Sequence, residues 1–278
     1  MIRNYLVGLL TLAFAGCANI PTPEQRYQTA ETMAAAAAWH SITLPADSFV
    51  LTSFLPKDLR ANDSHDGDLL TIYLEGDGLA WTSSSQASSD PTPNHPTGLQ
   101  LALRHPHGAA AYLARPCQYV SGDDRRNCSS TWWTDRRFAA EVVSATDRAV
   151  EQLKQLFKAK DIVLVGYSGG GAIAALVAAR RKDISRLVTV AGNLDHRAWT
   201  RQHKVSPLAE SLNPADEWQA LLDVEQVHFI GGSDNIVGRN IAESYAARFP
   251  ADRRPQLRVI EGFDHHCCWV EKWPELYR

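Results

Sequence analysis

The chain has 278 residues, a formal net charge of −3 at pH 7, and 21% charged residues without an extended basic run. This composition argues against a nucleic-acid partner, which would require a basic face. Hydrophobic residues make up 45% of the chain, and its length suits one α/β domain with a sizeable core.

The first sixteen residues are typical of a signal peptide. Arg3 supplies a positive charge, and residues 5–14 form an apolar run that is too short to cross a bilayer comfortably. The small residues before Cys17 resemble the lipobox of bacterial lipoproteins, although Phe14 stands where a leucine is usual. We therefore expect a signal peptide over 1–16 and lipidation of Cys17. Plain secretion and an uncleaved anchor are the alternatives.

The segment 17–40 is expected to be a lipidated tether that becomes a helix, because it contains the alanine run 34–38. Ala18 stands where an aspartate would favour the inner membrane in enterobacterial lipoproteins. This resemblance implies a lipid-anchored protein of the bacterial envelope, on the periplasmic face of the outer membrane. The membrane would then be a partner through the lipid.

From residue 41 onward, apolar β-branched runs alternate with helical segments, which predicts a mostly parallel sheet with helices on both faces. Pro45 is expected to break the chain between the first two strands. The amphipathic segment 137–158 is a predicted helix, and the polar excursion 195–216 would be at most a minimal cap. The predicted strands span 41–44, 49–55, 69–74, 109–114, 161–165, 187–191, 227–230 and 257–260.

The most informative motif is the Gly-x-Ser-x-Gly sequence of residues 166–170. It follows the predicted buried strand 161–165 and precedes a helical run of small residues. This context is typical of a nucleophile elbow, in which a strained turn exposes the serine and glycines prevent a clash between strand and helix. We therefore predict that Ser168 is a nucleophile. Without that context, the motif would indicate only a turn.

Two further polar groups follow predicted strands. Asp234 lies in a Gly-Gly-Ser-Asp turn, and His265 follows the last strand. The carboxyl ends of parallel strands meet at one edge, where such sheets place their sites. An imidazole can take the proton of a serine, and a carboxylate can orient the imidazole. We predict Ser168, His265 and Asp234 as catalytic residues, with His266 as the alternative base and Asp195 as the alternative acid.

The order Ser, Asp, His resembles that of α/β-hydrolases, and the resemblance covers the chain from about residue 41 to the C-terminus. The segments 73–81, 115–119 and 264–269 more closely resemble a group of bacterial α/β-hydrolase lipoproteins. This resemblance implies an α/β-hydrolase fold for a domain over 41–278 and a serine hydrolase mechanism, but it names no substrate.

A serine hydrolase needs two backbone amides, the oxyanion hole, to stabilise the negative oxygen of the reaction intermediate. One amide should be that of Gly169, next to the nucleophile. The resemblance implies that the other is the amide of Asp77, with Gly78 as the second choice, because relatives often carry His-Gly-x at this position. Acidic Glu75 and Asp77 are unusual beside a developing negative charge. They either point away or bind a cationic group of the substrate.

The remaining cysteines fit an oxidising compartment. Cys117 and Cys128 flank a polar loop and are predicted to form a disulfide, with two free thiols as the alternative. Cys267 and Cys268 are adjacent and could form a vicinal disulfide, pair elsewhere or stay reduced. Consecutive residues cannot easily surround one tetrahedral zinc ion, so we expect neither a metal nor another cofactor.

The sequence thus predicts an envelope serine hydrolase that cleaves a small-molecule carboxylic ester or thioester through an acyl-enzyme intermediate. Amide hydrolysis would use the same groups. The alternative from another class is a non-catalytic lipoprotein that uses the hydrolase fold as a binding module. Five tryptophans on loops near the predicted catalytic edge are candidates for an apolar acyl pocket: Trp81, Trp132, Trp133, Trp199 and Trp269.

Overall fold

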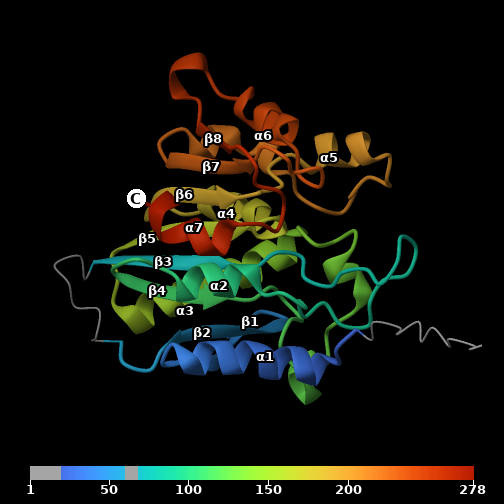
Figure 1. Ribbon diagram of the computed structural model, residues 1–278, viewed down its shortest axis with the longest axis vertical. Coiled ribbons are helices and arrows are strands. Elements are labelled where there is room, and N and C mark those ends of the chain that lie inside the picture. The colour runs from blue at the N-terminus through green and yellow to red at the C-terminus, as the bar shows by residue number, and fades with distance from the viewer. Residues whose placement is uncertain (1–19, 60–67) are drawn as a thin grey trace, which may run out of the picture.

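A single mixed sheet organises the chain in the computed structural model, which describes residues 20–59 and 68–278. Its eight strands lie in the order β1-β2-β4-β3-β5-β6-β7-β8 (Figure 1). β2 is antiparallel to β1 and β4, and the strands from β4 to β8 in this order pair in parallel. The strands are β1 (Trp39–Ala46), β2 (Phe49–Pro56), β3 (Leu69–Leu74), β4 (Ala109–Leu113), β5 (Asp161–Tyr167), β6 (Ile184–Val190), β7 (Glu225–Gly231) and β8 (Gln256–Ile260).

Helices cover both faces of the sheet, as the alternating pattern predicts. One core cluster lies beneath α3, α4 and α6, and a second lies beneath α1, α2 and α7, which stand in front of the sheet in Figure 1. The helices are α1 (Pro23–Ala36), α2 (Thr97–Leu103), α3 (Ala140–Phe157), α4 (Gly169–Ala178), α5 (His196–His203), α6 (Arg239–Ala246) and α7 (Trp269–Leu276). The sequence pattern does not predict α2 or α7.

The first hairpin differs from the prediction at Pro45. β1 continues through this proline, which pairs with Val50, so the expected break is wrong. β1 is an edge strand of the described sheet, and an edge strand tolerates a residue without an amide hydrogen. The chain turns instead at Asp47, whose φ is 53°.

The long amphipathic helix begins three residues later than predicted. α3 starts at Ala140, because the preceding residues use their polar groups elsewhere. The amide of Phe138 donates to the hydroxyl of Ser211 (3.1 Å), and the guanidinium of Arg137 contacts Asp77 (2.8 Å). These two contacts hold the segment before α3 against other parts of the domain.

The helix expected within 17–40 is α1, and it packs against the domain. Ala30 is fully buried against the sheet, and Arg26 is only 5% exposed. The guanidinium of Arg26 donates to the carbonyl of Thr92 (2.5 Å) and pairs with Asp90 (3.3 Å). These buried contacts fix the start of α1 to the loop that follows β3.

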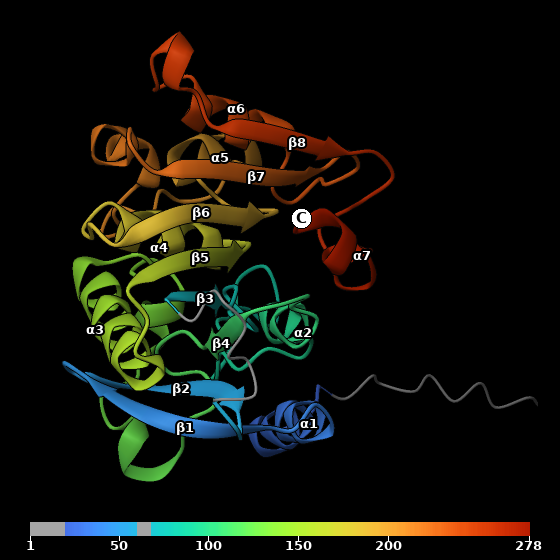
Figure 2. The ribbon, with the colours of Figure 1, turned by 90° about the vertical axis from the view of Figure 1, so that its left-hand side faces the viewer.

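The predicted signal peptide and Cys17 lie outside the described residues. Within 20–59 and 68–278, no helix has the length and apolar character needed to cross a bilayer. Figure 2 shows that the described chain begins on the side toward which the β5 and β6 arrows point.

Candidate active site

Ser168 stands at the tight turn between β5 and α4. Its φ of 51° and ψ of −121° form a strained conformation that L-residues rarely adopt. A Cβ added to Gly166 would lie 2.3 Å from the carbonyl oxygen of Gly170, and one added to Gly170 would lie 2.4 Å from that of Glu75. The helix therefore lies too close to β5 for a side chain at Gly166 and too close to the end of β3 for one at Gly170, and the strained turn indicated by the motif is present.

Three side chains form a hydrogen-bonded series at the carboxyl edge of the sheet. Nε2 of His265 lies 3.0 Å from Oγ of Ser168, and its Nδ1 lies 2.8 Å from Oδ2 of Asp234. The imidazole is 7% exposed and the carboxylate is fully buried, so water scarcely competes for these contacts. This geometry allows the imidazole to accept the proton of the serine while the carboxylate holds the other ring nitrogen.

The turn after β7 fixes the carboxylate of Asp234. Its Oδ1 accepts hydrogen bonds from the amides of Ile236 and Val237, both at 2.8 Å. The second oxygen is thereby aimed at His265. A Gly-Gly-Ser-Asp turn after a strand is the local signal that identifies this residue in the sequence.

The alternative acid and base are not part of this hydrogen-bonded series. Asp195 caps α5, where its carboxylate accepts from the amide of Ala198 (3.1 Å) and the hydroxyl of Ser244 (2.6 Å). His266 places Nδ1 3.3 Å from the hydroxyl of Tyr167. Burial lowers the pKa of His266, and the neighbouring His265 lowers it further.

The histidine loop, residues 264–268, is held by hydrogen bonds to the backbone. The hydroxyl of Tyr167 donates to the carbonyl of His265 (3.0 Å), and the two rings lie 5.5 Å apart. The carboxylate of Asp264 accepts from the amides of His266 and Cys267, both at 2.7 Å, and these hydrogen bonds lower the pKa of Asp264. Tyr167 directly precedes the nucleophile, so the elbow and the histidine loop support each other.

The oxyanion loop, residues 75–78, lies against the elbow. A Cβ added to Gly76 would lie 3.4 Å from Cβ of Ser168, and one added to Gly169 would lie 2.0 Å from Oδ1 of Asp77. Among the described residues, the amides of Asp77 and Gly169 donate no hydrogen bond. The two predicted amide donors therefore belong to segments that meet at the nucleophile.

The side chain of Asp77 is bound by two arginines of its own chain. Its carboxylate lies 3.2 Å from Nη1 of Arg115 and 2.8 Å from Nη1 of Arg137. Burial would raise the pKa of Asp77, but the two guanidinium groups outweigh burial and hold it below its usual value. Arg115 also donates to the backbone carbonyl of Arg137, so the three residues form one connected cluster. We call Asp77, Arg115 and Arg137 the arginine clamp.

Glu75 also points into the protein. Its carboxylate accepts from the amides of Gly98 (3.1 Å) and Leu99 (3.3 Å) in the first turn of α2, and from the hydroxyl of Tyr112 (3.1 Å). Burial raises the pKa of Glu75, and hydrogen bonds from backbone amides oppose this increase. Both acidic side chains therefore have partners within the protein, which agrees with the first predicted possibility, that they point away from the developing negative charge.

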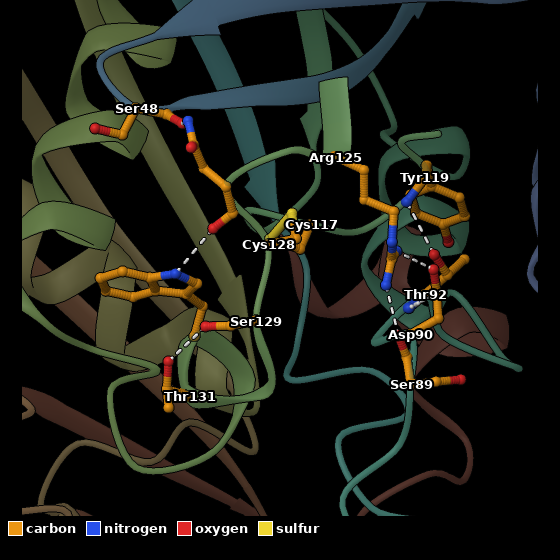
Figure 3. The surroundings of a disulfide bond; sticks show 12 residues. Ser48, Ser89, Asp90, Thr92, Cys117, Tyr119, Arg125, Cys128, Ser129 and Thr131 are labelled. Carbon is orange, nitrogen blue, oxygen red and sulfur yellow. Dashed lines mark hydrogen bonds and ion pairs between the residues drawn. A yellow bond between two sulfur atoms is a disulfide. The ribbon is translucent and has the colours of Figure 1, made fainter. Parts of the chain in front are cut away.

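Cys117 and Cys128 are paired, with Cα atoms 5.7 Å apart (Figure 3). Next to this disulfide, the side chain of Gln118 donates to the carbonyl of Gly76 (3.0 Å) and accepts from the amide of Arg115 (3.0 Å). The disulfide therefore borders the segment that supports the oxyanion loop. In the other predicted cysteine pair, Cys267 and Cys268 are bonded to each other.

A cleft of about 200 Å³ opens beside Ser168. None of the candidate tryptophans lines it, so the prediction that tryptophans form the pocket is wrong. Trp133, for example, is buried and donates to the carbonyl of Ser88 (3.2 Å). The excursion 195–216 does not line the cleft either. The lining residues are Glu75, Gly76, Asp77, Gly78, Leu79, Pro93, Asn94, His95, Thr97, Tyr167, Ser168, His265 and His266.

The described ranges contain no group of three or more histidine, cysteine, aspartate or glutamate side chains that could hold a metal ion. The arginine clamp is the part of the site that sequence reasoning missed. Arg115 lies within a segment that resembles the hydrolase lipoproteins, but nothing local indicates its partner.

Comparisons with known proteins agree on the fold. A family model described as alpha/beta hydrolase fold matches residues 105–219. Est1E from Butyrivibrio proteoclasticus is 16% identical, with a TM-score of 0.58, over 85% of this chain and 95% of that chain. The Pyrococcus furiosus esterase Pf2001 is 14% identical, with a TM-score of 0.58, over 93% of this chain and 92% of that chain.

An alpha-beta serine hydrolase homologue from Coxiella burnetii is 13% identical, with a TM-score of 0.56, over 85% of this chain and 93% of that chain. The comparison with curated proteins found no match. The structural likenesses show the fold at these identities, and the family model agrees with them. The chain therefore has the predicted α/β-hydrolase fold.

Proposed function

We propose that the protein is a serine hydrolase that cleaves a carboxylic ester or thioester through a covalent acyl-enzyme. The observation that carries this proposal is the hydrogen-bonded series from Ser168 through His265 to Asp234 beside an open cleft. One similar structure, Pf2001, is named as an esterase, and another, Est1E, has been solved with ferulic acid bound. These names support the reaction class.

The reaction begins when Oγ of Ser168 attacks the carbonyl carbon and its proton passes to Nε2 of His265. The carbonyl oxygen becomes negative and accepts hydrogen bonds from the amides of Gly169 and Asp77. His265 then gives the proton to the departing oxygen or sulfur, and the bond from the carbonyl carbon to that atom breaks. Water, deprotonated by His265, hydrolyses the acyl-enzyme, which releases the acid and restores the serine.

The arginine clamp supports the step in which the carbonyl oxygen becomes negative. One carboxylate and two guanidinium groups leave a net positive charge beside the amide of Asp77. A positive charge there stabilises the negative oxygen, and the buried contacts hold the amide in position before the substrate arrives. Asp77, Arg115 and Arg137 therefore act as positioning residues through their side chains.

The location of the protein is part of the same proposal. A signal peptide over 1–16 and a lipid on Cys17 would place the hydrolase in the bacterial envelope, on the periplasmic face of the outer membrane. Mass spectrometry of the N-terminal peptide measures the lipid directly. We expect that Cys17→Ser abolishes the lipid, and an unmodified N-terminus at another residue would contradict the anchor.

A fluorophosphonate probe tests the catalytic proposal. The purified protein should label covalently, Ser168→Ala should abolish labelling and ester turnover, and Ser84→Ala, at an exposed serine, should retain both. Labelling that survives in Ser168→Ala would show that the nucleophile is another residue. A folded protein that neither labels nor turns over esters would favour the non-catalytic binding module.

A further inference from the structure

We propose that the cleft faces the membrane that anchors the chain, and that the substrate is an ester presented at the surface of a lipid bilayer. This inference rests on the proposed hydrolase activity and on the proposed lipid at Cys17. Three features of the rim loop, residues 75–96, carry it. This loop joins β3 to α2.

The first feature is that the rim loop forms much of the cleft wall. It supplies the oxyanion loop at its start and Pro93, Asn94 and His95 near its end. The cleft therefore opens beside the rim loop.

The second feature is that the rim loop holds the start of α1. Arg26 lies in the first turn of α1, its side chain is 4% exposed, and it pairs with the buried carboxylate of Asp90. It also donates to the carbonyl of Thr92, which directly precedes cleft-lining Pro93. Arg125 pairs with the same carboxylate (Figure 3). A buried ion pair supported by further hydrogen bonds fixes the start of α1 to the rim loop.

The covalent length of the tether then limits the orientation of the domain. Thr22 caps α1, and Cys17 lies five residues before it. Five residues span at most about 18 Å when fully extended. Because the chain leaves the domain beside the rim loop, a lipid at Cys17 holds that edge nearest to the bilayer. The cleft edge therefore faces the membrane.

The third feature is an exposed tryptophan on the rim loop. Trp81 is 43% exposed and lies two residues after cleft-lining Leu79. Ile236, which is 39% exposed, follows Asp234 at the same edge of the sheet. Tryptophan favours the boundary between lipid and water, where its apolar ring and its N–H group are both accommodated. Because Trp81 is exposed and the tether to Cys17 is short, a bilayer surface is the partner that we expect Trp81 to contact.

These features define the class of substrate. The cleft is open and has a volume of only about 200 Å³, so it suits an ester group at the level of the lipid headgroups better than a long acyl chain drawn out of the bilayer. The bonds made and broken are those of the proposed hydrolysis. Membrane attachment supplies the local concentration of substrate.

Photocrosslinking tests the orientation. The full-length lipidated protein is reconstituted in vesicles of phosphatidylethanolamine and phosphatidylglycerol, with p-benzoylphenylalanine in place of Trp81 or, as the control, Leu156. Leu156 is 44% exposed, and it lies in the last turn of α3, which leads to the start of β5 at the opposite edge. We expect lipid adducts at position 81 to exceed those at position 156 by about tenfold, as for a site that rests in the interface. Equal or reversed yields overturn the orientation.

An activity ratio tests the substrate class. Turnover of a short ester carried on a vesicle lipid is divided by turnover of p-nitrophenyl butyrate in solution. Trp81→Ser should lower this ratio by up to about tenfold, because it removes the exposed aromatic ring that is proposed to enter the bilayer surface, whereas Leu156→Ser should leave it unchanged. An unchanged ratio in Trp81→Ser overturns the role of Trp81.

The two premises fail in distinguishable ways. An unlipidated Cys17 overturns the membrane orientation but leaves the Ser168 labelling result intact. Absence of labelling overturns the hydrolase and the substrate class, but the crosslinking comparison still reports the orientation.

Discussion

The two walls of the cleft are held by different kinds of contact. The oxyanion loop is fixed by the arginine clamp, in which a carboxylate lies between two buried guanidinium groups. The histidine loop is fixed by hydrogen bonds between side chains and backbone. The hydroxyl of Tyr167 donates to a backbone carbonyl of the loop, and the carboxylate of Asp264 accepts from two of its backbone amides. This difference matches the proposed reaction. One wall meets a developing negative charge and benefits from fixed positive charge. The other holds an imidazole that gains and loses a proton, and its supports include few fixed charges.

Removal of the imidazole should have the largest effect. His265→Ala should lower kcat by about 10²–10⁴-fold, because the serine loses its general base. His266→Ala should change kcat far less, since His266 contacts Tyr167. Steady-state kinetics on p-nitrophenyl butyrate measures both variants, and a larger loss in His266→Ala would mean that the base is assigned to the wrong histidine.

Neutralising Asp77 should destabilise the oxyanion wall most strongly. Asp77→Asn leaves two buried guanidinium groups without their shared counterion, and the free energy of unfolding should fall by about 3 kcal/mol. Because the pKa of Asp77 is lowered in the folded protein, its contribution is present above the pKa of the unfolded chain and is lost as the pH falls through the folded value. Urea unfolding should therefore show a difference between wild type and variant at pH 7 that shrinks in acid.

Two controls sharpen this result. Arg137→Met leaves Asp77 paired with Arg115, so it should lower the unfolding free energy less than Asp77→Asn and should lower kcat more than it raises KM. Asp124→Asn, at an exposed position, should change neither the unfolding free energy nor the kinetic constants. A cost in Arg137→Met that exceeds the cost in Asp77→Asn would contradict the charge argument.

Loss of the Cys117–Cys128 disulfide should affect stability more than chemistry. Cys117→Ser combined with Cys128→Ser should lower the unfolding free energy by about 3 kcal/mol, since the unfolded chain gains freedom. The labelling rate of Ser168 at 25 °C should change only modestly, because the hydrogen-bonded series lies outside the closed loop. Thermal unfolding followed by circular dichroism gives the first quantity. A complete loss of labelling in the folded variant would show that the disulfide directly supports the site.

The smallest effect is expected on the histidine wall. Tyr167→Phe removes one hydrogen bond to the carbonyl of His265, so stability should fall by about 1 kcal/mol and kcat should fall only slightly. The expected loss is smaller than that in Asp77→Asn, because no buried charge is left without its partner. Urea unfolding and steady-state kinetics compare the two variants. Equal losses would mean that the two walls depend on their supports to the same degree.

The sheet and the positions of Ser168, Asp234 and His265 could be predicted because each has a local signal. An apolar run is followed by a turn with a polar side chain, and parallel topology brings such turns to one edge. The structure joins these three residues by hydrogen bonds. The kinetic and labelling experiments test their catalytic roles.

Other features depend on partners that are distant in the chain. Arg137 meets Asp77 across 60 residues, and nothing in the sequence near either residue indicates the other as its partner. α2 has no side-chain cap of its own at Pro96, and Glu75 binds its first amides across 23 residues. α7 contains Pro274, which argues against a helix when the sequence is read locally. Only the folded chain supplies the contacts that define these elements.

The packing of α1 has a practical consequence for protein production. A truncated form that starts at residue 41, where the sequence predicts the start of the domain, would lack α1. The surface over which Ala30 packs would then be open to water, and Asp90 would lose one of its two arginine partners. Such a truncation should aggregate on expression. A form that starts at Ile20 keeps the helix and its cap, and it is the appropriate soluble protein for crystallisation and for screening esters.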